Sequence, residues 1–211
     1  MRLYPIKAPR MVRMLFPYYT WSFPLDKKEI YLTFDDGPIP EVTEFVLKEL
    51  NKYNAKATFF CIGDNIRKHP KVFHQIHNEG HSIGNHTFNH LNGWKTSVND
   101  YYINTQKAEE FILKHTASLK LFRPPYSKIK RKQAKFLISK GYKIIVWSVL
   151  SGDFDSKITK ETCLENVLKN TKNGSIVVFH DSIKAHEKLR FVLPKVLEEF
   201  TKQGYAFKAI T

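Results

Sequence analysis

The sequence of 211 residues predicts an α/β fold, and three features of the chain support this. Short runs of β-branched and aromatic residues alternate with longer amphipathic segments, as expected for strands that are each followed by a helix. Glycines stand where several amphipathic segments end, which is a common position for glycine after a helix. Acidic, arginine and histidine side chains directly follow the apolar runs, as at the carboxyl edge of a parallel sheet.

Seven apolar runs are predicted to be strands. They are rich in the residues that favour extended backbone. In chain order they cover residues 30–34, 57–61, 81–84, 119–122, 143–147, 175–179 and 205–209. Because strands joined by helical crossovers usually lie parallel, we expect one parallel sheet.

The segments between these runs have the spacing of amphipathic helices. Residues 41–53 are the clearest example, since Val42, Val46 and Leu50 lie on one apolar face. The other helices are predicted at residues 70–78, 98–115, 131–139, 160–170 and 188–202, with Gly80, Gly141 and Gly204 just after three of them.

The composition favours a single folded domain. Hydrophobic residues make up 42% and aromatic residues 14% of the chain, far more than in a disordered sequence. We expect the proline-bearing residues 1–25 to pack as an arm on one domain of residues 26–211. Cys61 and Cys163 are far apart and form no CxxC pattern, so neither a disulfide framework nor a cysteine metal site is expected.

The net charge of +14 would attract anionic partners. The lysines are spread along the chain with one short cluster at residues 128–132, and no nucleic-acid-binding signature is present, so a solvated basic surface is the preferred interpretation. No apolar run approaches the roughly 18 residues of a membrane span, and the first residues do not have the pattern of a signal peptide. These features predict a cytoplasmic protein and leave its oligomeric state open.

Two carboxylates, Asp35 and Asp36, follow the first strand in the segment TFDDGP. Adjacent side chains point in different directions, so one carboxylate could bind a metal while the other faces a water molecule. The alternative is an ordinary turn, in which Asp, Gly and Pro are common.

Two histidines, His86 and His90, follow the third strand in NHTFNH. At a spacing of four they would share one face of a helical turn and could bind one ion. With an aspartate from another strand they would form a three-ligand set, as in catalytic zinc sites. Two surface histidines are the alternative.

Further candidate residues follow the later strands. Arg123 in RPPY could hold the Asp35 carboxylate, and the rigid loop after it could direct a backbone N–H toward an oxyanion. His180 in IVVFHD could protonate a leaving amine, with Asp153 as a partner that keeps it charged. The alternatives are a surface arginine and a core histidine.

Taken in order, the segments TFDDGP, HTFNH, RPPY, WSVLSGDFD and IVVFHD resemble the motifs of the NodB-homology polysaccharide deacetylases, carbohydrate esterase family four. The resemblance implies a distorted (β/α) barrel of about seven parallel strands. It also implies an enzyme that removes N-acetyl groups from a peptidoglycan- or chitin-like carbohydrate. It implies a bound divalent metal, for which zinc is the first candidate and cobalt, nickel and manganese are the alternatives.

The same resemblance implies a role for each site residue. Asp36, His86 and His90 would bind the metal, Asp35 would be the general base and His180 the general acid. Arg123 would orient Asp35, Asp153 would tune His180, and the backbone N–H of Tyr126 would help the metal stabilise the tetrahedral oxyanion.

Four residues depart from the commonest family pattern: Leu91, Ser127, Leu150 and Phe154. None is a proposed metal ligand, acid or base. These changes alter the groove walls, so they affect the expected identity of the substrate and the role of Asp153 more than the expected reaction type. Two alternatives remain open. One is an amidohydrolase that acts on a small linear or cyclic amide in an enclosed pocket; an open groove lined by Trp94, Tyr126 and Trp147 would instead favour a polymer. The other is a non-catalytic carbohydrate-binding module.

Overall fold

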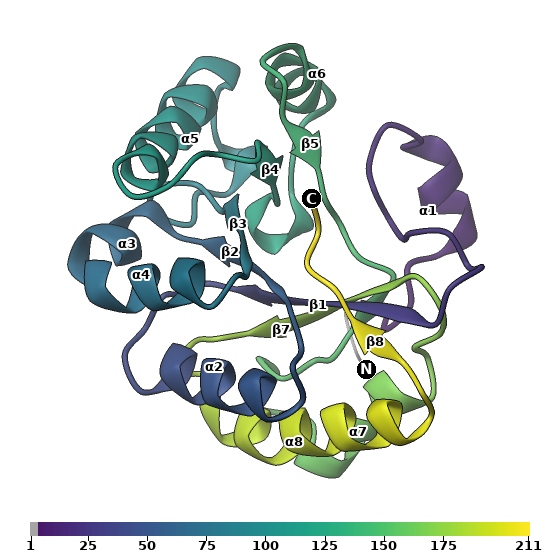
Figure 1. Cartoon of the computed structure of the whole chain (residues 1–211). Coiled ribbons are helices and arrows are strands. Elements are labelled where there is room, and N and C mark those ends of the chain that lie inside the picture. Colours follow the sequence, from purple (N-terminus) through teal and green to yellow (C-terminus); the bar gives the residue numbers. More distant parts are fainter. Residues whose placement is uncertain (1–3) are drawn as a thin grey trace.

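Parallel strands form the centre of the protein, as a computed structural model of residues 4–211 shows (Figure 1). The strands lie in the order β5-β4-β3-β2-β1-β7-β6, and β8 pairs with β1. Their bounds are β1 Glu29–Asp35, β2 Thr58–Cys61, β3 Ser82–Asn85, β4 Leu121–Phe122, β5 Lys143–Ile144, β6 Val149–Leu150, β7 Ser175–His180 and β8 Ala206–Phe207. The predicted parallel α/β architecture is confirmed, in the form of a half-barrel.

Helices surround the outside of the half-barrel (Figure 1). They are α1 Arg10–Leu15, α2 Val42–Lys52, α3 Gly63–Lys68, α4 Pro70–Asn78, α5 Val98–Leu113, α6 Arg131–Ser139, α7 Lys160–Leu168 and α8 His186–Lys202, with short 3-10 turns η1 Gly93–Lys95 and η2 Pro125–Ser127. The sequence predicted six of these helices but not α1 or α3. Within residues 4–211, no helix combines the length and the apolar character required to cross a bilayer.

Side-chain alternation along β1 separates the core from the site. Leu32 and Phe34 are fully buried in the main hydrophobic cluster, which includes residues of α2 and α8. Thr33 and Asp35, one position out of phase, contact the Arg123 side chain instead. Successive side chains on a strand point to opposite faces, so one strand supplies both the packing and the polar site.

The predicted strand at residues 143–147 was wrong in extent, because β5 ends at Ile144 and the chain re-enters the sheet as β6. β5 and β6 are the two ends of the strand order and do not pair with each other. Residues of the N-terminal arm bond to β5 and to the segment between the two strands: Thr20 N–H donates to Ile144 O, Thr20 O accepts from Val146 N–H, and Ala8 N–H donates to Ser148 O. The domain boundary at residue 25 stays a prediction, and residues 1–3 of the arm lie outside the described part of the chain.

We expect Phe34→Ala to lower the free energy of unfolding by about 3–5 kcal/mol, because truncating a buried aromatic side chain leaves a cavity. The Phe34 ring lies 5.1 Å from Phe59 and 5.9 Å from Phe179, between centroids, so it joins the three central strands. Denaturant unfolding measures the change. Phe136→Ala, at a side chain that is 36% exposed, is the matched control. Equal losses in the two variants would contradict this view of the core.

Candidate active site

Asp35 ends β1, and Asp36 begins the loop after it, which is held from two sides. Asp36 has a left-handed backbone (φ 84°), which is costly for a residue other than glycine. The Asn65 side-chain amide donates to Asp36 O (2.7 Å), and Gly37 N–H donates to Asp181 Oδ1 (3.0 Å). Asp181 Oδ2 in turn accepts from the Thr43 hydroxyl (2.6 Å). These contacts fix the direction of the Asp36 side chain.

Asp36, His86 and His90 come together as a group that could hold a metal ion. Their ligand atoms lie within 4.8 Å of one another. The His86 and His90 Nε2 atoms lie 3.7 Å and 3.3 Å from Asp36 Oδ1. That carboxylate oxygen is buried and has no hydrogen-bond partner among the described residues. Since buried polar atoms are nearly always paired, this oxygen suits a cation that bridges the three side chains.

The two histidines do not share a helical turn, so that part of the sequence interpretation was wrong. The segment after β3 is a loop in which Thr87 (φ 65°) and His90 (φ 58°) have left-handed backbones. The Thr87 hydroxyl accepts a hydrogen bond from Leu91 N–H (2.9 Å), and this bond stabilises the loop. The loop, rather than helical spacing, brings the two imidazoles together, with ring centroids 5.1 Å apart.

Burial favours the neutral form of both imidazoles, and a hydrogen bond sets the tautomer of His86. His86 Nδ1 lies 2.7 Å from Arg123 O, and because a carbonyl only accepts, Nδ1 carries the proton and Nε2 presents its lone pair to Asp36. Burial lowers the pKa of His86. Burial, followed by the neighbouring His86, lowers the pKa of His90 to about 4. Metal ligation requires the neutral imidazole, which both histidines therefore favour.

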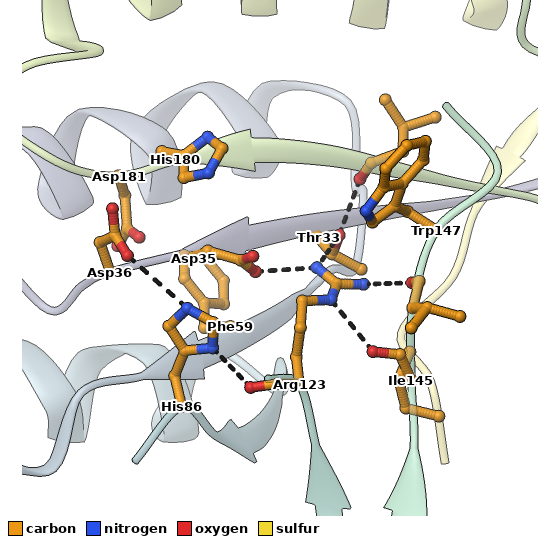
Figure 2. A network of polar contacts seen from close by, with 12 residues as sticks. Thr33, Asp35, Asp36, Phe59, His86, Arg123, Ile145, Trp147, His180 and Asp181 are labelled. Carbon is orange, nitrogen blue, oxygen red and sulfur yellow. Dashed lines mark hydrogen bonds and ion pairs between the residues drawn. The ribbon is translucent and has the colours of Figure 1, made fainter. Parts of the chain in front are cut away.

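Arg123 follows β4 and forms the most extensive side-chain contacts of the site (Figure 2). Its Nη1 donates to Asp35 Oδ1 (2.8 Å) and Thr33 Oγ1 (2.7 Å), and its Nη2 donates to Val146 O (2.8 Å). Its guanidinium also lies 4.1 Å from the centre of the Phe60 ring. Burial acts to raise the pKa of Asp35, but the charges of Arg123 and His180 outweigh it and the pKa is lowered. The carboxylate is thus kept ionised.

His180 ends β7 and is paired with the fully buried Asp153. Its Nδ1 lies 2.8 Å from Asp153 Oδ1, and its backbone N–H donates to Asp153 Oδ2 (2.7 Å). Burial acts to lower the pKa of His180, but the Asp153 carboxylate reverses this effect and the pKa is raised to about 10. The imidazole of His180 is therefore charged at neutral pH, in contrast to His86 and His90.

Tyr126 lies at the exposed edge of the site. Its backbone is left-handed (φ 59°), and its ring lies 4.3 Å from the His90 ring, between centroids. The side chain is 59% exposed. Nearby, Trp147 Nε1 donates to the Ser127 hydroxyl (3.0 Å), while Trp94 is 60% exposed beneath the Lys128 ammonium. Of the three aromatic residues predicted to line an open groove, Tyr126 and Trp94 are therefore exposed to solvent.

Asp181 is the site residue that the sequence interpretation missed. Burial raises its pKa to about 8, and it supports the loop after β1 through Gly37 and Thr43. Its position directly after His180 in IVVFHD was the only available signal. Among the histidines outside the site, His81 accepts from Ala57 N–H in the core, which agrees with a structural role.

Comparisons with known proteins agree with this arrangement. A family model for polysaccharide deacetylases matches residues 23–145. A peptidoglycan-N-acetylglucosamine deacetylase of Bacillus cereus is 37% identical over 92% of this chain and 92% of its own length. A chitooligosaccharide deacetylase of Azorhizobium caulinodans is 32% identical over 77% of this chain and 78% of its own length.

Solved structures show the same relationship. The chain is similar to a peptidoglycan N-acetylglucosamine deacetylase in complex with 4-naphthalen-1-yl-N-oxidanyl-benzamide, with a TM-score of 0.89 and 33% identity, over 96% of this chain and 95% of that chain. The relatives above are named as N-deacetylases, which hydrolyse carbon–nitrogen bonds. The motifs, the half-barrel and these relatives together establish that the chain belongs to the polysaccharide deacetylase family, carbohydrate esterase family four.

Proposed function

We propose that this protein removes N-acetyl groups from N-acetylglucosamine units of peptidoglycan, using a divalent metal, zinc, at Asp36, His86 and His90. The observation that carries the proposal is the meeting of three groups at one end of the sheet: the possible metal ligands, the Arg123–Asp35 pair and the His180–Asp153 pair. This constellation contains the parts that amide hydrolysis requires, which are a base, an acid and a site for an electrophile.

The residues at the site fit a metal. The unpartnered Asp36 oxygen and two imidazoles with lowered pKa values form a carboxylate and nitrogen donor set that suits zinc. The ligand of the solved relative contains an N-hydroxy amide, a chemical group that chelates metals. When bound, the cation supplies Lewis acidity to water and to an amide carbonyl.

In the proposed mechanism, Asp35 and His180 divide the proton transfers. Asp35 is ionised and oriented by Arg123, so it accepts a proton from the attacking water. The water oxygen adds to the acetamide carbonyl carbon, and the backbone N–H of Tyr126 is proposed to donate to the resulting oxyanion. His180, charged because of Asp153, then protonates the nitrogen as the carbon–nitrogen bond breaks. The products are acetate and a free amino sugar.

The exposure around the site supports a polymer rather than a small amide as substrate. Tyr126 beside His90 is 59% exposed, and Ile183, three residues after His180, is 77% exposed. Extended substrates need such open walls, whereas small-molecule sites usually enclose most of the ligand surface. The names of the relatives agree with this choice, since they specify peptidoglycan or chitooligosaccharide.

Metal binding gives the first test. We expect His90→Ala to weaken zinc binding to chelator-treated protein by roughly 100-fold or more, because loss of even a supporting residue commonly costs 10- to 100-fold. Titration calorimetry gives the affinity, and the zinc-dependent rise in melting temperature checks it independently. His74→Ala on α4, outside the site, is the control. An unchanged affinity in His90→Ala would remove this histidine from the ligand set.

Acetate release tests the reaction. We expect zinc-dependent release from peptidoglycan fragments and from N-acetylglucosamine oligomers, and a fall in kcat of about 10²- to 10⁴-fold in Asp35→Asn, which lacks the basic carboxylate. Metal binding by the variant, measured separately, shows that its site is intact. If the zinc-loaded wild type releases no acetate from either substrate, the polymer proposal fails and small cyclic amides become the next substrates to test.

The pH dependence of kcat tests the role of His180. A general acid must be protonated, so kcat falls as pH rises through its pKa, which Asp153 raises to about 10. Asp153→Asn removes this charge, and we expect the alkaline limb to move to lower pH by about two pH units or more. Asp155→Asn, which changes a neighbouring carboxylate, is the control. An alkaline limb that stays in place in Asp153→Asn would show that His180 is not the acid.

A further inference from the structure

Helix α1 presents its apolar side chains to solvent rather than to the core. None of its residues, all within the described part of the chain, is buried. Met11 is 76%, Met14 72% and Leu15 61% exposed, and Tyr18 just beyond the helix is 83% exposed. Within the helix, Met11, Met14 and Leu15 have the spacing i, i+3 and i+4, which on a surface helix normally marks the face that packs inward. We call these three side chains, together with the exposed Tyr18 that follows the helix, the apolar face of α1.

The arm holds α1 at a fixed place on the domain. Before the helix, Leu150 N–H donates to Ile6 O and Ala8 N–H to Ser148 O. After it, Thr20 is bonded to both Ile144 and Val146. Figure 1 shows α1 (purple) on the opposite side of the molecule from α3 and α4. The exposed apolar face is therefore carried by a segment that is bonded to the sheet at both ends.

Cations border the apolar face. Lys7, Arg10 and Arg13 line an open cavity of about 650 Å³ together with Met14 and Trp21. The Arg131 guanidinium lies 5.5 Å from the centre of the Phe16 ring, which brings the basic cluster at residues 128–132 next to α1. The surface thus combines protruding apolar side chains with a cationic border.

We propose that this surface binds an anionic lipid bilayer, with Met11, Met14, Leu15 and Tyr18 inserted at the interface and the surrounding cations facing lipid phosphates. A hydrated anionic polymer would satisfy the cations but would leave the apolar face in water. A second copy of the chain would cover the apolar face but would bring two cationic borders together, in a protein with a net charge of +14. A bilayer with anionic headgroups satisfies both parts of the surface.

Vesicle sedimentation tests the proposal with the full chain. We expect binding to phosphatidylglycerol-containing vesicles and much weaker binding to phosphatidylcholine vesicles. Binding to the anionic vesicles should fall strongly at about 1 M salt, where the Debye length is only roughly 3 Å. The variant Met11→Ser/Met14→Ser/Leu15→Ser should lower vesicle partitioning about tenfold or more, because it removes the inserted side chains. Arg10→Gln/Lys7→Gln should lower binding to anionic vesicles only.

Exposed apolar side chains outside α1 provide the matched control. Ile103→Ser/Leu113→Ser/Leu119→Ser removes three of them and should leave vesicle binding unchanged. The α1 variants should retain the circular dichroism spectrum and the zinc affinity of the wild type. Absence of binding to anionic vesicles, or equal losses in the α1 and control triples, would overturn the proposal. So would a concentration-dependent dimer by light scattering that the α1 triple abolishes, which would assign the face to a second copy.

Discussion

The buried Arg123–Asp35 ion pair is the interaction on which the rest of the site depends. The guanidinium joins the end of β4 to β1 and to the residues after β5, and the Arg123 backbone carbonyl also fixes the tautomer of His86. One residue therefore orients the proposed base with its side chain and a possible metal ligand with its main chain. A buried charge is tolerated only when it is paired and hydrogen-bonded, which explains why this network is so complete.

The proposed base and acid end two strands, whereas strained loops after the strands carry other residues of the site. Asp36, His90 and Tyr126 all have left-handed backbones, and each follows a strand of the parallel sheet. Such conformations persist only where surrounding contacts outweigh their cost. Asn65 and Asp181 provide such contacts on either side of Asp36. The electrostatic contrast between neutral His86 and His90 and charged His180 comes from the same scaffold, because only His180 has a buried carboxylate at 2.8 Å.

The sequence predicted most of the elements and the residues that meet at the site, because hydrophobic period and position after a strand are local signals. It did not predict that a loop joins His86 and His90, since a spacing of four is shared by helices and by tight loops. It missed β6, which has only the two residues Val149 and Leu150 and lies between β7 and the N-terminal arm, both distant in sequence. It also missed the support from Asp181, since its partners Gly37 and Thr43 lie far away in the chain. These features depend on long-range contacts that no local pattern encodes.

The pairing of β1 with β7 has a consequence for how the chain is made. Thr33 and Val177, which are hydrogen-bonded in the folded protein, are 144 residues apart in sequence. During synthesis β1 acquires β2 as a neighbour early, but its other edge stays open until almost the whole chain has emerged. Exposed edges of apolar strands promote association between chains, so the nascent protein has a long interval in which chaperones matter. A product truncated before β7 would lack both the strand that closes this edge and His180.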